Sequence, residues 1–454
     1  MVKRYPAYSE YKSTHLGWLN RIPDHWQIKR LKYLGDAIIG LTYSPNDVVE
    51  ESKGVLVLRS SNIQNKKLTY EDNVYVDKRV SPKLVTQKGD ILICARNGSR
   101  ALIGKNAQID DRSTGLTFGA FMSIFRGPLN DYLSQVFNST LFEYQSGSFL
   151  TSTINQLTTG NLNNFEIPLP PEDERAQIAN FLDHETAKID TLIEKQQQLI
   201  ALLKEKRQAV ISHAVTKGLN PDAPMKDSGV EWLGEVPEHW DTCKLKHACT
   251  DIFLGLTSRV DYVEDGGVPL VRALNISGGI LDLEFAREIS IEQHKQLTKY
   301  RRAVRDDILL SKSGTIGTAA IVDIDEEFSI YESIFALRAY RKNLIPEYLL
   351  CYIQSSIAKG QYAKGAVGMG VHHLNMPDIQ DVIIPLPPLT EQVKIYEFLN
   401  RQRAKLNLLE ERANQQINLL KERRTALISA AVTGKIDVRN WQQPTTPQNT
   451  LDTP

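Results

Sequence analysis

The stretch Ile-Pro-Leu-Pro-Pro spans residues 167–171 and returns, letter for letter, at residues 384–388. Proline suits the first turn of a helix because the amide it lacks has no partner there. Glu172, Asp173 and Glu174 follow the first copy, and acidic side chains favour the positive N-terminal end of a helix. Each copy therefore predicts the start of a helix.

The repeat extends far beyond this stretch in both directions. Pro-x-His-Trp occurs at residues 23–26 and 237–240, and Ala-Val-Thr occurs at residues 214–216 and 431–433. Ordered matches of this kind over about 200 residues indicate one module used twice, since two copies are too few for a solenoid.

Each module has two parts. The first holds short β-rich runs such as residues 54–58, 90–93 and 308–310, punctuated by Gly, Asn and Asp. The second is a heptad-patterned helix of about 40 residues, or about 60 Å. We therefore predict an α+β protein in which two pseudo-twofold-related α/β domains are joined by two long, antiparallel, coiled-coil-like helices. In the alternative, each helix docks on its own domain.

This organisation predicts five segments along the chain. The first globular domain covers residues 1–170 and the first helix covers 171–218. The second domain covers 219–388 and the second helix covers 389–434. Residues 435–454, rich in Pro, Thr and Gln towards their end, are expected to be largely disordered.

Motifs for catalysis, metal binding and membrane insertion are missing from the sequence. The run from Gly98 to Lys105 fails the spacing of a phosphate-binding loop, and Cys94, Cys243, Cys249 and Cys351 form no C-x-x-C pair. No apolar run approaches the ~20 residues of a membrane span, and the first residues lack the apolar core of a signal peptide. We expect a cytoplasmic protein with no catalytic residues, no metal site and no membrane partner.

A combination of motifs resembles a known family. Trp232-Leu233-Gly234, the Pro-x-His-Trp and Ile-Pro-Leu-Pro-Pro stretches, Glu391-Gln392 and residues 431–437 are together similar to the specificity subunit of Type I restriction–modification enzymes. The resemblance covers nearly the whole chain. The first copy departs from it at Asn20, where the second has Gly234, and at Arg175, where the second has Gln392.

The resemblance implies a non-catalytic subunit that recognises a bipartite sequence in double-stranded DNA. Each globular domain would be a target recognition domain for one half-site, and the helices would set the gap. The helices would also dock two methyltransferase subunits, and restriction subunits would join them. S-adenosylmethionine, ATP and magnesium would lie on those partners, with no cofactor bound directly by this chain. The candidate partner-binding residues are apolar heptad positions of both helices: Ile178, Leu182, Ile189, Leu192, Leu199, Ile395, Leu399, Leu406, Leu409 and Leu420.

Candidate DNA-binding residues are polar side chains in loops, where the two copies differ. In the first copy Arg96, Asn97, Ser99 and Arg100 follow a predicted strand, and the equivalent loop of the second copy offers Lys312, Ser313 and Thr315. Arginine can bind guanine with two hydrogen bonds and asparagine can bind adenine in the same way, whereas lysine and serine more often contact phosphates.

Further candidates are shared by both copies or lie in a basic run. Arg59 and Asn62 return as Arg272 and Asn275, and they either belong to the scaffold or contact DNA. Lys299, Arg301 and Arg302 belong to a basic run over residues 295–305, which is either a phosphate-binding track or a solvated helix face.

The charge balance bears on this function. The chain has 54 basic and 54 acidic residues, but residues 1–170 hold 20 basic and 15 acidic groups whereas residues 219–388 hold 17 and 24. Neutrality is thus a cancellation, and we expect partner subunits to supply much of the affinity for DNA. Two alternatives stay open: an adenine-specific DNA methyltransferase or fused restriction enzyme, and a coiled-coil scaffold that binds only proteins.

Overall fold

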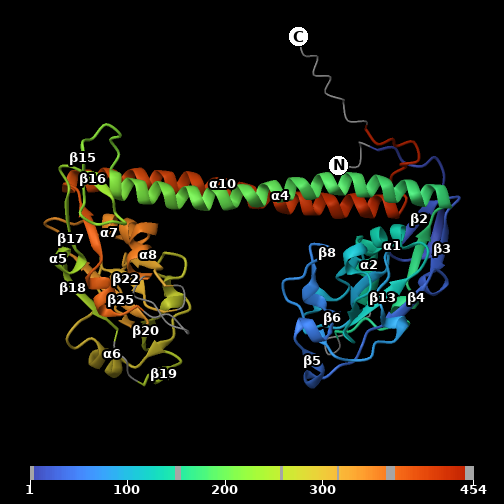
Figure 1. Ribbon diagram of the computed structural model, residues 1–454, viewed down its shortest axis with the longest axis horizontal. Coiled ribbons are helices and arrows are strands. Elements are labelled where there is room, and N and C mark those ends of the chain that lie inside the picture. The colour runs from blue at the N-terminus through green and yellow to red at the C-terminus, as the bar shows by residue number, and fades with distance from the viewer. Residues whose placement is uncertain (1–4, 149–154, 256–258, 314–315, 364–373, 445–454) are drawn as a thin grey trace, which may run out of the picture. The chain divides into compact units, whose positions relative to one another are not determined.

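The computed structural model describes residues 5–148, 155–255, 259–313, 316–363 and 374–444. Two compact units divide the chain: unit 1 comprises residues 1–196 and 415–454, and unit 2 comprises residues 197–414 (Figure 1). The long helices α4 (Glu172–Lys217) and α10 (Leu389–Val432) each contribute residues to both units. The predicted α+β class with two similar domains and two long helices is confirmed.

Unit 1 contains two four-stranded sheets. The first is antiparallel in the order β11-β10-β13-β4, and the apolar strand β10 is buried at all four positions because it lies in the interior of this sheet. The second has the order β12-β6-β9-β5, in which β12 and β6 are parallel. The strand bounds are β4 Asp36–Ile39, β5 Val48–Val49, β6 Val55–Leu58, β9 Tyr75–Val76, β10 Ile91–Cys94, β11 Asn106–Gln108, β12 Thr117–Phe118 and β13 Met122–Arg126.

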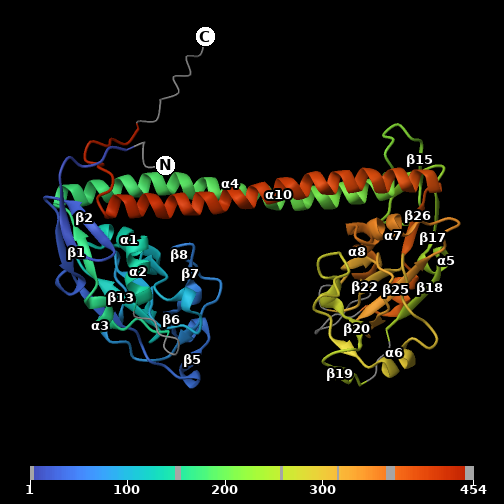
Figure 2. The same cartoon turned by 180° about the vertical axis from the view of Figure 1, so that it is seen from behind.

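Smaller elements complete unit 1. Three two-stranded pairs are β1 (Tyr11–Leu16) with β2 (Leu19–Pro23), β3 (Gln27–Arg30) with β14 (Glu166–Leu169), and β7 (Ile63–Gln64) with β8 (Lys67–Leu68). The short helices are α1 (Asn130–Phe137), α2 (Thr140–Ser148) and α3 (Thr159–Asn163). In both views α1 and α2 lie beside the long helices, whereas β5 lies at the far side of the unit (Figures 1 and 2).

Unit 2 repeats this arrangement with its own two sheets. Their orders are β18-β25-β22-β23 and β19-β21-β20-β24, and β20 and β24 are the parallel pair. The strands are β15 Met225–Asp227, β16 Glu235–Pro237, β17 Asp241–Lys244, β18 Cys249–Leu254, β19 Tyr262–Val263, β20 Val268–Val271, β21 Glu288–Ile289, β22 Ile308–Ser311, β23 Ala319–Ile321, β24 Ser329–Ile330, β25 Ile334–Ala339 and β26 Ile383–Leu386. The helices are α5 Leu245–Ala248, α6 Ile291–Leu297, α7 Pro346–Ile353, α8 Ser356–Ala363 and α9 Met376–Gln380.

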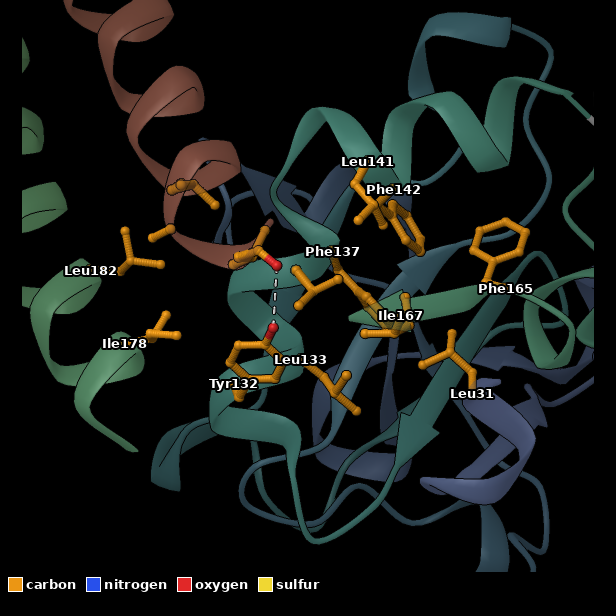
Figure 3. Packing of buried hydrophobic residues seen from close by; sticks show 14 of the residues in the cluster. Leu31, Tyr132, Leu133, Phe137, Leu141, Phe142, Phe165, Ile167, Ile178 and Leu182 are labelled. Carbon is orange, nitrogen blue, oxygen red and sulfur yellow. Dashed lines mark hydrogen bonds between the residues drawn. The ribbon is translucent and has the colours of Figure 1, made fainter. Parts of the chain in front are cut away.

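The core of unit 1 joins the start of α4 to the end of α10. Ile178 and Leu182 of α4 and Ile428 and Val432 of α10 lie in one buried cluster with α1. Figure 3 shows Tyr132 of α1 within this cluster, and its hydroxyl donates to the carbonyl oxygens of Pro168 (2.8 Å) and Val432 (3.4 Å). Helix α10, which begins in unit 2, therefore ends in the core of unit 1.

Unit 2 has the reciprocal arrangement. Ile211 and Val215 near the end of α4 pack with Ile395 and Leu399 near the start of α10. Tyr348 of α7 donates to the carbonyl oxygens of Val215 and Pro385, both at 3.1 Å. The helices are antiparallel within each unit, as predicted, and the alternative in which each helix docks only on its own domain is wrong.

A glycine follows the end of each long helix. Gly218 follows α4 with φ of 77°, and Gly434 lies two residues after α10 with φ of 69°. These left-handed conformations favour glycine because other residues carry a Cβ that crowds the backbone there.

The segment after α10 corrects one expectation. Ile436 and Val438 are buried in the core of unit 1, Trp441 packs edge-on against Phe181, and the amide of Asp437 donates to the Pro6 carbonyl oxygen at 2.8 Å. Residues 435–441 are therefore part of the fold, because their apolar side chains complete this core. Residues 445–454 lie outside the described residues.

Candidate nucleic-acid interface

Unit 1 carries an open hollow of about 1340 Å³. It is lined by the connection between β4 and β5, the end of β6, the residues after β10 and the turn before β13. Three predicted DNA-binding residues, Arg59, Arg96 and Asn97, lie together in its wall. The structure thus brings together residues that are 37 positions apart in the sequence.

Arg96 is the most available cation of this hollow. It follows β10, is exposed, and its backbone amide donates to the Phe121 carbonyl oxygen at 2.9 Å. Its guanidinium carbon lies 5.2 Å from the centroid of the Phe121 ring, which is 60% exposed. A cation over an aromatic face is held in place without losing its hydrogen-bond donors. Sequence reasoning missed Phe121.

Arg59 is more constrained. Its guanidinium contacts an Asp72 carboxylate oxygen at 2.8 Å and donates to the Asp72 carbonyl oxygen at 3.2 Å. In unit 2 the corresponding Arg272 lies 5.4 Å from the ring centroid of Tyr331 and contacts the Tyr262 hydroxyl at 3.5 Å. The two shared arginines therefore have different partners in the two units.

Asn62 and Asn275 are both buried, which leaves their carboxamides little access to DNA. The Asn62 carboxamide oxygen accepts from the Arg59 amide at 2.9 Å, and its nitrogen donates to the Thr69 carbonyl oxygen at 3.1 Å. Asn275 makes the same two contacts with Arg272 and Asp282, at 3.0 and 3.1 Å. These contacts fix the turn after the strand, which favours the scaffold interpretation of this shared pair.

Internal hydrogen bonds hold some of the other side chains of the first candidate loop. The Asn97 carboxamide donates to the Ser60 hydroxyl at 3.2 Å and accepts from the Ser99 amide at 2.9 Å. Arg100 donates to the Gly147 carbonyl oxygen at 3.3 Å. Ser99 and Arg100 are exposed but do not line the hollow. Asn97 is therefore a positioning residue of this loop.

The second candidate loop differs from the first in residue type. Lys312 and Ser313 are half-buried after β22, and the Lys312 amide donates to the Ser333 carbonyl oxygen at 2.8 Å. Thr315 lies outside the described residues. In unit 2 a hollow of about 160 Å³ lies beside Tyr300, Arg301 and Arg302.

The basic run of unit 2 is largely paired with acidic residues. Arg301 lies 3.5 Å from Asp251, Arg302 lies 2.6 Å from Glu327, and Arg305 lies 2.6 Å from Asp325. Lys299 is exposed and lies 5.2 Å from the Tyr300 ring centroid. The phosphate-binding track stays a prediction, in which carboxylates from other segments compete with DNA for Arg301 and Arg302. The alternative of a solvated helix face is wrong, because α6 ends at Leu297, before this part of the run.

Equivalent buried ion pairs support the two sheets. Arg126 binds Asp90 and Arg338 binds Asp307, each through Nε and a terminal nitrogen at 2.6–2.8 Å. The carboxylates are 2% and 1% exposed, and these hydrogen bonds raise the pKa of both arginines. Both pairs are scaffold, so they fix the strands that precede the candidate loops.

The Pro-x-His-Trp motif anchors each unit to the start of a long helix. Trp26 donates to a Glu174 carboxylate oxygen at 3.0 Å, and His25 contacts the other oxygen at 2.7 Å. Trp240 and His239 contact Glu391 at 3.1 and 2.9 Å. These histidines therefore have a structural role, because the carboxylate links the motif to the first turn of α4 or α10.

One hairpin differs between the units in its charge. Lys66 has φ of 65° at the tip between β7 and β8, and its ammonium group donates to the Asn138 carbonyl oxygen at 3.2 Å. Burial, together with the nearby Arg424 guanidinium, lowers the pKa of Lys66 to about 8. Gly279 takes this position in unit 2, since Asp282 pairs with Asn275 as Thr69 pairs with Asn62.

The candidate partner-binding residues divide into two groups. Ile178, Leu182, Ile189, Ile395, Leu399 and Leu406 are at most 5% exposed within their units. These six stabilise the fold, which corrects their assignment as a docking surface. Leu192, Leu199 and Leu409 are 38–47% exposed, and Leu420 is half-buried. A partner could therefore reach only this second group without unfolding a unit.

Membrane insertion is not indicated for any helix. In the part of the chain that the structure describes, none is both long and apolar enough to cross a bilayer.

The two units share the same sheet orders and the same buried polar contacts, so the fold defines a protein that contains one α/β module twice. The sequence signature of the Type I restriction modification DNA specificity domain matches residues 23–202 and 237–419. The chain belongs to this family of Type I restriction–modification specificity proteins.

Relatives of known identity agree with this assignment. The chain is 24% identical to the Type I restriction enzyme EcoKI specificity subunit of Escherichia coli, covering 93% of this chain and 91% of that protein. It is 27% identical to the MjaVIII specificity subunit of Methanocaldococcus jannaschii over 61% and 63% of the two chains. A solved chain from work on assembly and conformational transition of the type I R-M system covers 91% of this chain and 99% of its own, with a TM-score of 0.62 and 19% identity, which supports the fold.

The protein is thus a DNA sequence-recognition subunit of a Type I restriction–modification complex. It is not itself catalytic, and its partners are DNA and the modification and restriction subunits. The match favours neither alternative, the methyltransferase or the protein-only scaffold.

Proposed function

We propose that each unit reads one half of a bipartite DNA sequence. The observation that carries this proposal is a shared scaffold around dissimilar loops. Both units keep the Asn62/Asn275 turn and the Asp90/Asp307 ion pair. The loops that these features hold differ in charge and in size, as expected for modules that recognise different sequences.

The helices set the gap between the two half-sites. α4 and α10 are unbroken over 46 and 44 residues, and each contributes to both units. Equivalent faces of DNA recur every 34–36 Å, or 10–10.5 base pairs, so a recognition protein with a fixed spacer tolerates a narrow range of gaps.

Two methyltransferase subunits dock on the helices, and restriction subunits join that assembly. Exposed Leu192, Leu199 and Leu409 offer apolar contact area for such partners. S-adenosylmethionine, ATP and magnesium bind to the partner subunits, and the assembly works in the cytoplasm, where it meets DNA. No membrane takes part.

Mapping of adenine methylation tests the proposal. The chain is co-expressed with its modification subunit, and methylated adenines are identified in a random-sequence DNA library. We expect one bipartite motif with a fixed gap. A continuous motif, or methylation without sequence preference, would contradict the proposal.

An insertion tests the role of the helices as a spacer. Seven residues are added to α4 after residue 196 and seven to α10 after residue 414, which preserves the heptad pattern and adds about 10 Å. We expect the permitted gap to change, because 10 Å corresponds to about three base pairs along DNA. A variant with seven conservative substitutions in each helix at these places is the control. An unchanged gap would sink the spacer hypothesis.

A further inference from the structure

A second polar residue lies next to Arg96 in the hollow of unit 1. Gln156 forms an isolated antiparallel bridge with Arg96 and also lines the hollow. Side chains opposite each other in an antiparallel pair leave the same face of the backbone, with Cβ atoms about 4.5–5.5 Å apart. The two side chains are therefore neighbours, although 60 residues separate them in the sequence.

The other Arg, Asn and Gln side chains that line this hollow have hydrogen-bond or ion-pair partners within the protein. Arg59 is paired with Asp72, Asn97 with Ser60, and Asn155 donates to the Gly98 carbonyl oxygen at 3.1 Å. Within the described part of the chain, no hydrogen bond or ion pair engages the Arg96 guanidinium or the Gln156 carboxamide. Both can donate to a ligand without first breaking an internal bond.

The backbone beneath this pair is firmly held. The amides of Ala95 and Arg96 both donate to the Phe121 carbonyl oxygen, at 3.0 and 2.9 Å, and the Leu157 amide donates to the Ala95 carbonyl oxygen at 2.7 Å. The Phe121 ring also holds the Arg96 guanidinium in place. Binding of a ligand therefore costs little conformational entropy at this site.

We propose that Arg96 and Gln156 form a two-residue reader of adjacent base pairs in the DNA major groove. Arg96 binds guanine O6 and N7, and Gln156 binds adenine N6 and N7, which are the pairings that their donor and acceptor geometry favours. The roughly 3.4 Å rise between neighbouring bases is smaller than the Cβ spacing of about 4.5–5.5 Å, and the long side chains of Arg96 and Gln156 span the difference. This inference rests on the proposed function, because it assigns part of one half-site to unit 1.

Unit 2 cannot read this pair of bases in the same way. Ser311 opposes Ile334 as Cys94 opposes Met122, and Lys312 meets Ser333 as Ala95 meets Phe121. Ser313 therefore takes the place of Arg96, and Ser333 takes the place of Phe121. The counterpart of Gln156 is residue 373, which lies outside the described residues. The reader thus belongs to one half-site only.

Methylation mapping on the complex with modification subunits tests this inference with single substitutions. Arg96→Ala should reduce the preference for guanine at one position of a single half-site by about 5- to 150-fold, and Gln156→Ala should do the same for adenine at the adjacent position. Gln156→Glu should shift the preference from adenine to cytosine, because a carboxylate accepts from cytosine N4. Unfolding midpoints of the variants should match the wild type, since these side chains make few internal contacts.

Matched substitutions outside the hollow serve as controls. Arg79→Ala and Gln64→Ala remove exposed side chains of the same types, and we expect both to leave the motif unchanged. Equal weakening on all sequences, an unaltered motif, or changes at non-adjacent positions would overturn the inference. A wild-type complex without a bipartite motif would instead overturn the proposed function, so the two failures are distinguishable.

Discussion

The two units share their buried polar contacts and differ in their exposed ones. Glu174 and Glu391 bind equivalent Trp and His side chains, and Tyr132 and Tyr348 reach equivalent helix ends. By contrast, Arg96 and Phe121 line the hollow of unit 1, and serines replace both residues at the corresponding positions of unit 2. Removing the partner of a buried polar group destabilises the folded protein strongly, whereas removing the partner of an exposed group destabilises it little. The residues of exposed loops can therefore vary without loss of the fold. The comparison separates the scaffold from the recognition surface.

Removal of the buried tryptophans is expected to have the largest effect. Trp26→Ala and Trp240→Ala should each lower the free energy of unfolding by about 3–5 kcal/mol, because both rings are fully buried. The loss should be larger for Trp26→Ala, because the carboxylate left without its tryptophan donor is more buried there. Glu174 is 6% exposed, whereas Glu391 is 24% exposed. Urea unfolding followed by circular dichroism measures both. Tyr33→Ala, at a 70% exposed ring, is the control, and an equal loss there would contradict this ranking.

Loss of the buried carboxylates comes next. Asp90→Asn and Asp307→Asn should destabilise the protein by about 2–4 kcal/mol, because each leaves an arginine without its buried partner. The cost should be larger in unit 1, since Arg126 is 22% exposed and Arg338 is 37% exposed. Denaturant titration at constant pH provides the values. Asp325→Asn, in an exposed pair with Arg305, should cost less than about 1 kcal/mol.

We expect Lys66 to make the free energy of unfolding depend on pH. The same hairpin position of unit 2 lacks this effect. Its pKa is about 8 in the folded chain, below the usual 10.5, so the folded state releases this proton first as pH rises. Its contribution to stability should therefore increase between about pH 8 and 10.5, by on the order of 2 kcal/mol. Lys66→Met should abolish that increase and stabilise the chain at pH 7.

The measurement is the difference in unfolding free energy between wild type and Lys66→Met at pH 7 and pH 9.5. Lys67→Met, at an exposed neighbour, is the matched control. A pH-independent difference for Lys66→Met would show that its charge is not buried. Gly279 has no side chain to titrate in unit 2.

The smallest effect is expected at the tyrosine hydroxyls. Tyr132→Phe and Tyr348→Phe each remove one donor to carbonyl oxygens and should cost about 1 kcal/mol. Amide hydrogen exchange in the last turn of α10 should rise for the first variant, and exchange in the last turn of α4 should rise for the second. Faster exchange in both helix ends from either substitution would contradict the separation of the two contacts.

The sequence was sufficient to predict the duplicated module, the long helices and their antiparallel pairing, because repeats and heptads are local patterns. Side-chain partners were less predictable. Asn62 and Asn275 have the right chemistry to read bases, but their carboxamides turn inward to satisfy backbone groups. Arg302 pairs with Glu327, 25 residues away, and periodicity carries no sign of that contact. Gln156 meets Arg96 only through tertiary pairing, so the sequence offered no signal for it.

The contacts between Tyr132 and Val432 and between Tyr348 and Val215 join segments that are distant along the chain. Such contacts make local unfolding cooperative, since melting of α1 also releases the last turn of α10. Ribosomal synthesis supplies residue 432 about 300 positions after residue 132. The first core therefore reaches its final packing only after nearly the whole chain has been made, whereas the core of unit 2 can close as soon as the start of α10 appears.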